Sequence, residues 1–193
     1  QLRELEEFRH MQRKDIARRV RPFLLRRMKE QVLDELPQKE EIIEKTELFP
    51  EQKALYAAYL AKLRVDTMKH LDKETFHKNR IRILAGITRL RQICCHPALF
   101  VEGYKGSSAK FEQLFHLLEQ SKASGRRVLI FSQFTQMLKM IATELSKRGE
   151  SYFYLDGQTP SEERVALCNA FNDGERDLFL ISLKAGGTGL NLT

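Results

Sequence analysis

Hydrophobic residues change their spacing about halfway along the chain. In the first half they recur every three or four residues, which predicts amphipathic helices over residues 51–65 and 80–95. Between them and the N-terminus, residues 40–48 alternate loosely and include Ile42, Ile43 and Thr46, so we expect a strand there. The side of the second helix that we expect to be buried consists of Ile83, Leu84, Ile87, Leu90 and Cys94.

After a glycine- and serine-rich hinge at residues 103–108, short apolar runs alternate with helical patterns. Strands are predicted at 128–132, 152–156 and 178–182, and helices at 109–122, 135–148 and 160–171. The first strand is apolar throughout, which is typical of a strand covered on both faces. Three strand–helix alternations with short connections predict an α/β fold, an open parallel sheet with helices on both faces, preceded by a mainly helical region.

Composition excludes several classes of protein. No apolar run among the 193 residues approaches the roughly 20 needed to span a membrane. Three cysteines, two of them adjacent (Cys94 and Cys95), favour a reducing compartment over a disulfide framework, and their spacing does not fit a metal site. The chain starts at Gln1 rather than Met, so we expect it to be a piece of a longer intracellular protein.

The net charge of +7 comes entirely from the first half. Residues 1–100 hold 22 basic and 15 acidic residues, whereas residues 101–193 hold 11 of each. The basic residues are densest between positions 9 and 29. Such a segment favours a polyanion as partner, nucleic acid being the usual one, although a solvated helix face or an acidic partner domain would explain it too.

Candidate chemistry follows the predicted strands, because ligands of parallel α/β sheets bind at the carboxyl ends of the strands. The sharpest feature is a glycine loop at residues 184–191, whose backbone N–H groups could approach phosphates closely. It lacks the Walker A pattern, and its position after the last strand disfavours a dinucleotide site. A glycine turn that only permits tight packing is the plainer alternative.

Further candidates lie at the helix starts and turns after the predicted strands. Ser132 and Thr135 flank a helix start, where they could help to bind an anion or simply cap the helix. Residues 159–162 (TPSE) read as a capping box with proline at the first helical position. Arg164 follows in the first turns, where a cation is not favoured by the helix dipole, so it has either a specific partner or a neighbouring glutamate. Asp156 is best explained as a turn residue.

Four segments together resemble the Swi/Snf-type DNA-dependent ATPases of helicase superfamily two. The segments are RPFLLRRMKEQVLDELPQK (21–39), LRQICCHPAL (90–99), VLIFSQF (128–134) with the later LDG (155–157) and Arg164, and SLKAGGTGLNL (182–192). The family's motor has two RecA-like lobes. The resemblance implies an inter-lobe linker over residues 1–40, a strand plus helical insertion over 41–105, and the second RecA-like lobe over 106–193, truncated before the sixth motif.

The resemblance also implies roles for individual residues. Contacts to DNA are expected of Ser132, Gln133, Arg164, Ser182, Lys184, Gly186 and Gly187. Gly189 and Asn191 would face the ribose of the nucleotide. Arg26, Arg27 and Lys29 would couple closure of the two lobes to DNA or simply brace the interface between the lobes. No metal ligand is expected in this chain.

The Walker A lysine, the Asp-Glu pair and the arginine finger of the family are absent from this sequence. We therefore expect ATP and Mg²⁺ to be held mainly by the first lobe, and this chain alone to hydrolyse no ATP. The full-length protein is expected to be an ATP-driven translocase on double-stranded DNA, acting on a DNA-bound protein, in the nucleus of a eukaryote or the cytoplasm and nucleoid of a bacterium. No membrane partner is expected.

Three other interpretations stay open at this point. An RNA helicase lobe would share the second half of the chain but not the helical insertion or the LRQICCHPAL segment. A non-catalytic basic adaptor would explain the charge but not the regular α/β pattern. An enzyme that binds a nucleotide or a methyl donor would use the glycine loop.

Overall fold

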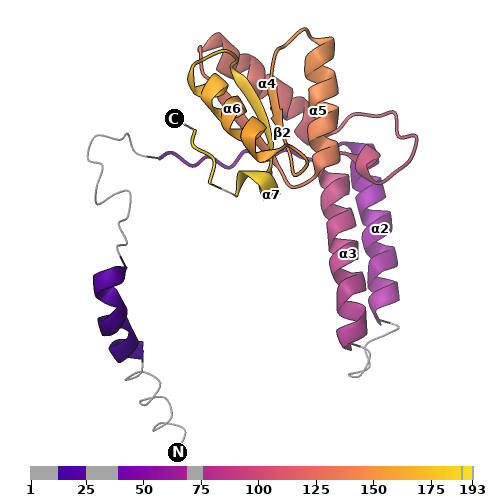
Figure 1. The fold of residues 1–193 in the computed structure, drawn as a ribbon. Coiled ribbons are helices and arrows are strands. Elements are labelled where there is room, and N and C mark those ends of the chain that lie inside the picture. Colours follow the sequence, from indigo (N-terminus) through magenta and orange to yellow (C-terminus); the bar gives the residue numbers. More distant parts are fainter. Residues whose placement is uncertain (1–12, 25–38, 69–75, 188, 193) are drawn as a thin grey trace, which may run out of the picture. The chain divides into compact units, whose positions relative to one another are not determined.

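The computed structural model describes residues 13–24, 39–68, 76–187 and 189–192 (Figure 1). Contacts divide the chain into two compact units, Gln1–Glu44 and Lys45–Thr193. In the first unit, residues 13–20 are helical and lead into a 3-10 turn, η1 (Arg21–Phe23), with proline in its first positions. All side chains described between residues 13 and 24 are exposed. The division into three segments at residues 40 and 105 stays a prediction.

The strand predicted over residues 40–48 is wrong, because residues 39–49 form neither helix nor strand. Ile42 and Ile43 are 76% and 81% exposed. No described segment pairs with this stretch, and an extended segment without a neighbouring strand or an apolar face to cover gains little. Its β-branched residues therefore indicated a local preference for a strand, but this segment forms no strand in the fold.

Two antiparallel helices, α2 (Pro50–Met68) and α3 (Phe76–Cys95), form a hairpin that we call the α2–α3 hairpin (Figure 1). The amphipathic helix predicted over residues 51–65 is confirmed, and its half-buried side consists of Leu55, Tyr56, Tyr59, Leu60 and Leu63. Gly86 of α3 is buried against Leu63 of α2, where an added Cβ would lie 2.4 Å from Leu63 Cδ1. The glycine therefore allows the two helices to approach closely.

The buried side predicted for α3 is partly wrong. Leu90 is buried and Ile83 and Cys94 are half-buried, but Leu84 and Ile87 are 54% and 44% exposed. The fully buried residue is Ile93 instead. A helix that packs mainly on one other helix buries a narrow strip, so a wide apolar stripe leaves its margin in solvent.

A buried glutamine joins the hairpin to the rest of the unit. Gln52 has no exposed surface, and its side chain makes three hydrogen bonds. Its Nε2 donates to the carbonyl of Ile93 at 3.1 Å, and its Oε1 accepts from the N–H groups of Ala109 at 3.0 Å and Phe49 at 3.3 Å. One amide thus links the start of α2, the end of α3 and the start of the next helix.

The connection after α3 is also built on polar contacts in a buried place. His96 begins the short turn η3 (Pro97–Leu99), and its Nδ1 accepts from the N–H of Ala98 at 3.2 Å. The ring packs edge-on against Tyr104 and Phe111, and burial lowers the pKa of His96. Ser108, fully buried, donates to the carbonyl of Cys95 at 2.7 Å and accepts from the N–H of Phe111 at 3.2 Å.

The remaining elements form what we call the α/β lobe. They are α4 (Ala109–Ala123), β1 (Val128–Ser132), α5 (Thr135–Lys147), β2 (Phe153–Leu155), α6 (Ser161–Asn172), β3 (Leu178–Ser182) and α7 (Leu183–Gly186). The three strands are parallel in the order β1-β3-β2, so β3 lies in the middle. Together with the helical hairpin before it, this confirms the predicted fold class.

Two hydrophobic clusters cover the two faces of the sheet. On one face α4 and α5 pack against β1 and β3, through residues such as Phe115, Leu138 and Leu180. On the other face α6 packs against β2 and β3, through residues such as Phe171 and Phe179. Helices therefore cover both faces, as the alternating pattern predicts.

One strand is less covered than its sequence indicates. In β1, Leu129 and Phe131 are 37% and 47% exposed, although full burial was expected. These residues lie opposite Phe179 and Ile181 of β3, which are fully buried. The face they share is covered over β2 and β3 by α6, and within the described residues β1 is the strand at the sheet's edge on this side.

Candidate nucleic-acid interface

The carboxyl ends of the strands bring several predicted site residues together. Ser132 ends β1 and Ser182 ends β3, and the two are direct partners in the parallel register. Leu155 at the end of β2 pairs with Ile181, so the turn after β2 opens at the same edge. This edge is the place where parallel α/β sheets bind their ligands.

Ser182 is 3% exposed, and its hydroxyl accepts from the N–H of Ala185 at 3.3 Å. That bond caps α7, a single helical turn that replaces the first part of the predicted glycine loop. Lys184 within this turn is exposed. Ser182 therefore positions the segment that carries Lys184, and its own hydroxyl already has a partner.

The glycines after β3 meet different structural requirements. At Gly186 an added Cβ would lie 2.9 Å from Cε1 of Phe131 and 3.2 Å from Ile181 Cγ2, so the loop packs directly on the sheet. Gly187 ends α7 and is exposed, with only ordinary contacts around the place of a Cβ. Gly189 has a φ of +66°, which other residues rarely adopt. Phe131, which sequence reasoning missed, forms the floor of this loop.

The start of α5 and the glycine loop follow two neighbouring strands, β1 and β3, at the same edge of the sheet. Phe134 is the N-cap residue of α5 and no side chain caps the helix, so its first N–H groups have no capping partner among the described residues. The hydroxyl of Ser132 accepts from the N–H of Phe134 at 3.1 Å, and Gln133 is exposed. Thr135 does not act as the cap. The N-terminus of α5 is therefore open to an anion, and the exposed Gln133 comes directly before it. Lys184 follows the end of the neighbouring strand β3 at the same edge of the sheet.

The turn after β2 is held by its own side chains. Asp156 Oδ1 accepts from the N–H of Gln158 at 2.8 Å, which confirms Asp156 as a turn residue. The hydroxyl of Thr159 accepts from the N–H of Asp156 at 3.1 Å, so the predicted capping box is wrong and Pro160 is the N-cap residue of α6. Arg164 Nε donates to the carbonyl of Thr159 at 2.8 Å. Its guanidinium thus lies against the turn at the carboxyl edge.

Not all predicted residues meet at this edge. Asn191 lies near the last residue of α6, Asn172, whose side chain donates to the Asn191 carbonyl at 3.1 Å. Since α6 begins next to the carboxyl edge and runs back across the sheet, Asn191 is at the far end of that helix from Arg164. Arg26, Arg27 and Lys29 lie outside the described residues.

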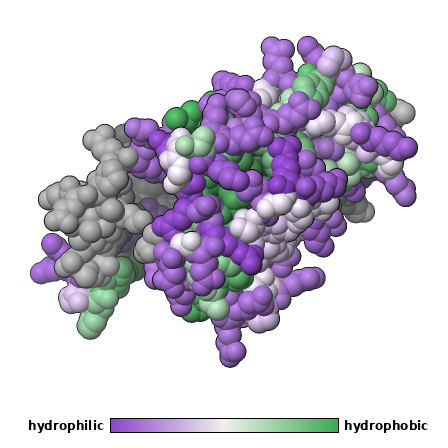
Figure 2. Space-filling view, turned by 90° about the horizontal axis from the view of Figure 1, so that it is seen from above, coloured by the Kyte–Doolittle hydropathy of each residue, from purple (hydrophilic) through white to green (hydrophobic). Residues whose placement is uncertain are grey.

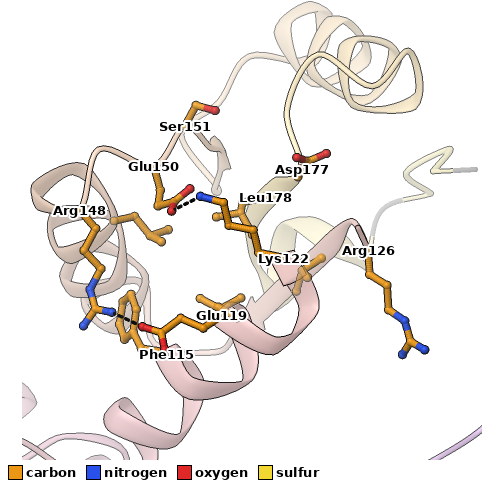
Figure 3. A pocket seen from close by; sticks show the side chains of 12 residues that line it. Phe115, Glu119, Lys122, Arg126, Arg148, Glu150, Ser151, Asp177 and Leu178 are labelled. Carbon is orange, nitrogen blue, oxygen red and sulfur yellow. Dashed lines mark hydrogen bonds and ion pairs between the residues drawn. The ribbon is translucent and has the colours of Figure 1, made fainter. Parts of the chain in front are cut away.

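A cavity of about 110 Å³ lies at the opposite, amino edge of the sheet (Figure 3). It is lined by the first residues of β1 and β3, Val128 and Leu178, and by Phe115 of α4. In Figure 3 the side chain of Arg126 points away from it. None of the predicted site residues lines this cavity.

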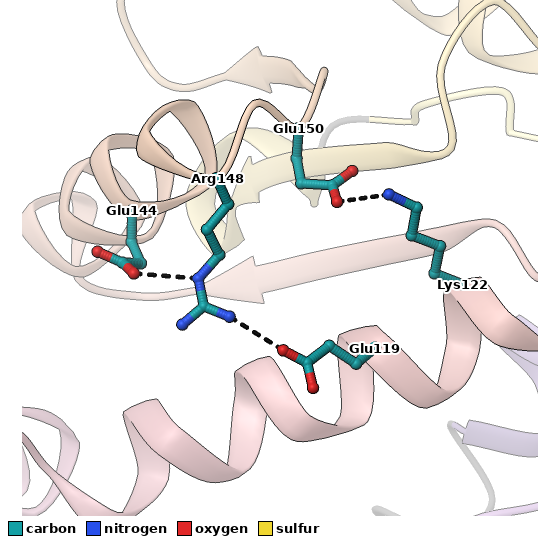
Figure 4. Close-up of polar contacts among 5 residues, drawn as sticks. All are labelled: Glu119, Lys122, Glu144, Arg148 and Glu150. Atoms are coloured by element: carbon teal, nitrogen blue, oxygen red, sulfur yellow. Dashed lines mark hydrogen bonds and ion pairs between the residues drawn. The ribbon is translucent and has the colours of Figure 1, made fainter.

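Ion pairs on the rim of this cavity join α4 to the end of α5 (Figure 4). Arg148 pairs with Glu144 at 3.0 Å and with Glu119 at 3.1 Å, and Lys122 pairs with Glu150 at 2.5 Å. Exposed pairs of this kind contribute about 0–1 kcal/mol each. We interpret the rim as a brace between two helices and not as a reaction site.

Two other kinds of site find no support within the described residues. No group of three or more histidine, cysteine, aspartate or glutamate side chains is placed to hold a metal ion there. Burial raises the pKa of Cys94, Cys95 and Cys168, which keeps these thiols protonated and unreactive. No described helix is both long enough and apolar enough to cross a membrane.

A parallel sheet with helices on both faces, and with glycine-rich and basic segments at its carboxyl edge, is the arrangement of a RecA-like helicase lobe. Family comparisons agree: a SNF2-related domain matches residues 2–99, and a helicase conserved C-terminal domain matches residues 109–193. The chain belongs to the SNF2-related family.

Among curated relatives, the chain is 41% identical over 182 residues to the putative ATP-dependent helicase/translocase YwqA of Bacillus subtilis. It is 40% identical over 189 residues to the nuclear protein STH1/NPS1 of Saccharomyces cerevisiae. In both cases the match covers 90% of this chain but only 19% and 14% of the relative. The chain thus spans less than a fifth of the length of these relatives.

Solved structures resemble the chain over most of its length. The C-terminal domain of the Sulfolobus solfataricus SWI2/SNF2 ATPase is 30% identical, with a TM-score of 0.66 over 75% of this chain and 64% of that one. The core of the same ATPase in complex with double-stranded DNA is 26% identical, with a TM-score of 0.68 over 89% of this chain and 37% of that one. Both structures share the fold described above.

Proposed function

We propose that the chain is part of an ATP-driven translocase on double-stranded DNA and supplies most of its second motor lobe. The observation that carries this proposal is the carboxyl edge of the sheet. There the open N-terminus of α5, the exposed Gln133 and Lys184, and the glycine loop surround the paired ends of β1 and β3.

This arrangement suits a phosphate backbone better than a base. Backbone N–H groups at a helix start and a lysine attract phosphates without regard to sequence. Gly187 and Gly189 themselves carry no side chain that would hold a DNA backbone at a distance. A structural relative is an ATPase core in complex with double-stranded DNA, which supports duplex DNA as the ligand.

Each residue of the site has a distinct part in this proposal. Gln133, Lys184, Gly186 and Gly187 contact DNA phosphates, and Ser132 and Ser182 hold the two strand ends in place for those contacts. Arg164 supports the neighbouring turn through the carbonyl of Thr159 and faces the same strand of DNA.

Binding of the nucleotide is proposed to involve few residues of this chain. Gly189 and Asn191 would lie near the ribose, and the first lobe would hold ATP and Mg²⁺, which supply the phosphoryl transfer. Arg26, Arg27 and Lys29 would couple the two lobes. The chain alone is then expected to hydrolyse no ATP, and a DNA-stimulated turnover by the isolated chain would contradict this.

The test is ATP hydrolysis by the full-length protein with duplex DNA, single-stranded DNA, RNA or no nucleic acid. We expect strong stimulation by duplex DNA alone. Stimulation by RNA would favour an RNA helicase, and no stimulation at all would favour a non-catalytic adaptor. Lys184→Ala should weaken stimulation by DNA, with Lys139→Ala, an exposed lysine on α5, as the matched control.

A further inference from the structure

The α2–α3 hairpin carries a charge that the α/β lobe does not. Its residues 50–68 and 80–95 include seven basic and two acidic residues, whereas residues 96–193 hold eleven of each. The helix α3 contains no acidic residue in its 20 positions. A polyanion near the lobe would therefore be attracted first to the hairpin.

Two arginines of α3 line one groove between the helices. Arg82 and Arg89 border a groove of about 270 Å³ together with Tyr59 and Thr67 of α2. They are seven residues apart, so they lie on the same side of α3, about 10 Å apart along its axis. Both are exposed, and neither forms an ion pair with a described residue. Asp66 also borders the groove, which leaves the set with a net positive charge.

One of these arginines is already held in place. The guanidinium of Arg89 lies 5.1 Å from the ring centroid of Phe100, and its Nη1 donates to Gln92 Oε1 at 3.1 Å. An arginine ordered in this way loses less conformational entropy when it binds a phosphate. Its remaining N–H groups are free to donate to an anion.

The side of α3 opposite the two arginines is aliphatic. Leu84 and Ile87 are exposed there, more than 130° around the helix from Arg82 and Arg89. On the face of the molecule in Figure 2, hydrophilic residues predominate and hydrophobic ones form smaller areas among them. The polar groove side, and not the aliphatic side, fits a phosphate backbone.

We propose that Arg82 and Arg89 form a second contact to the DNA backbone, on the α2–α3 hairpin and separate from the carboxyl edge of the sheet. This inference rests on the proposed function and adds a binding site to it. Gln52 connects this contact to the α/β lobe, because its side chain bonds the hairpin to the first residue of α4. A phosphate held on the hairpin is then held relative to the lobe.

The experiment measures the affinity of the full-length protein for duplex DNA at several salt concentrations. Each phosphate contact contributes about 0.9 to the slope of log K against log salt, so R82A/R89A should lower that slope by roughly 1.8. R82Q/R89Q, which removes both charges but keeps a polar side chain at each position, should do the same. R82K/R89K keeps both charges and should restore most of the slope.

The matched control is Arg126→Ala, which removes an exposed arginine at the amino edge of the lobe and should leave the slope unchanged. An unchanged slope in both R82A/R89A and R82Q/R89Q would overturn the proposal. An acidic protein would then be the better candidate for the partner of this groove. An equal loss in Arg126→Ala would overturn it as well, since the effect would then be one of net charge. Failure of the unaltered protein to bind duplex DNA would instead contradict the proposed function.

Discussion

The α2–α3 hairpin and the α/β lobe bury their residues in different ways. The lobe has two hydrophobic clusters with fully buried side chains such as Leu138, Leu155 and Leu180. Within the described part of the hairpin, Gln52 and Ile93 are the side chains with no exposed surface, and both lie at its junction with the lobe. The lobe is therefore stabilised by its own core, whereas the hairpin depends on where it is attached.

The largest effect should come from the core of the lobe. Leu180 has no exposed surface in the central strand, so Leu180→Ala should lower the free energy of unfolding by about 2–5 kcal/mol. Leu84→Ala on the hairpin, where the side chain is 54% exposed, should change it by no more than about 0.5 kcal/mol. Urea unfolding of the 193-residue chain measures both. Equal losses would mean that the hairpin contributes to a shared core after all.

The junction should give an effect of similar size. Gln52→Ala leaves the N–H of Ala109 and the carbonyl of Ile93 buried without their partner, at about 1–3 kcal/mol for each group. Hydrogen exchange should accelerate in α2 and α3 more than in β3, because the hairpin loses its attachment while the sheet keeps its core.

The control for this junction is Gln136→Ala, which removes an exposed glutamine on α5 and should change neither region. If Gln52→Ala accelerated exchange equally throughout the chain, the hairpin and the lobe would unfold as one cooperative unit, and the comparison drawn above would fail.

A smaller effect is expected within the lobe at the carboxyl edge. Ser182→Ala removes the cap of α7 and should cost about 1 kcal/mol. In the full-length protein the same change should weaken binding of duplex DNA by displacing Lys184. Ser151→Ala, at an exposed position in the loop before β2, is the control. A stability loss without any change in DNA affinity would limit Ser182 to a structural role.

The smallest effect concerns pH and the junction. Burial lowers the pKa of His96 in the folded chain below its ordinary value of about 6.5. The unfolded chain then binds a proton first as pH falls, so this residue stabilises the fold fully above about pH 6.5 and less as pH falls toward the lowered pKa. His96→Asn, which keeps an acceptor for the N–H of Ala98, should flatten the pH dependence of unfolding between pH 8 and 5. An unchanged pH profile would show that another group is responsible.

Prediction from sequence succeeded where periodicity and burial agree. The apolar runs that became β1 and β3, and the helices between them, gave the parallel sheet because each run has a covered face in the fold. The position of Ser132 and Ser182 at one edge followed from strand direction alone. These features depend on local pattern and on general rules of topology.

The wrong predictions have a common physical cause. Whether a residue is buried depends on the segments packed against it, and a local sequence pattern does not show which segments those are. Ile42 and Ile43 read as a strand but have no partner strand among the described residues. Leu84 reads as core but lies beyond the strip that α2 covers. Gln52 had no sequence signal, since a buried amide in an amphipathic helix looks like any polar residue.

The order of the strands has a consequence for how the chain is made. β1 and β2 each pair with β3, which is the last of the three to leave the ribosome. Until Ser182 has been synthesised, both earlier strands lack their neighbour, and residues 50 positions apart, such as Val128 and Leu178, must then meet. The nascent lobe therefore assembles in one late step, and a ribosome that stalls before residue 178 would hold two apolar strands in need of a chaperone.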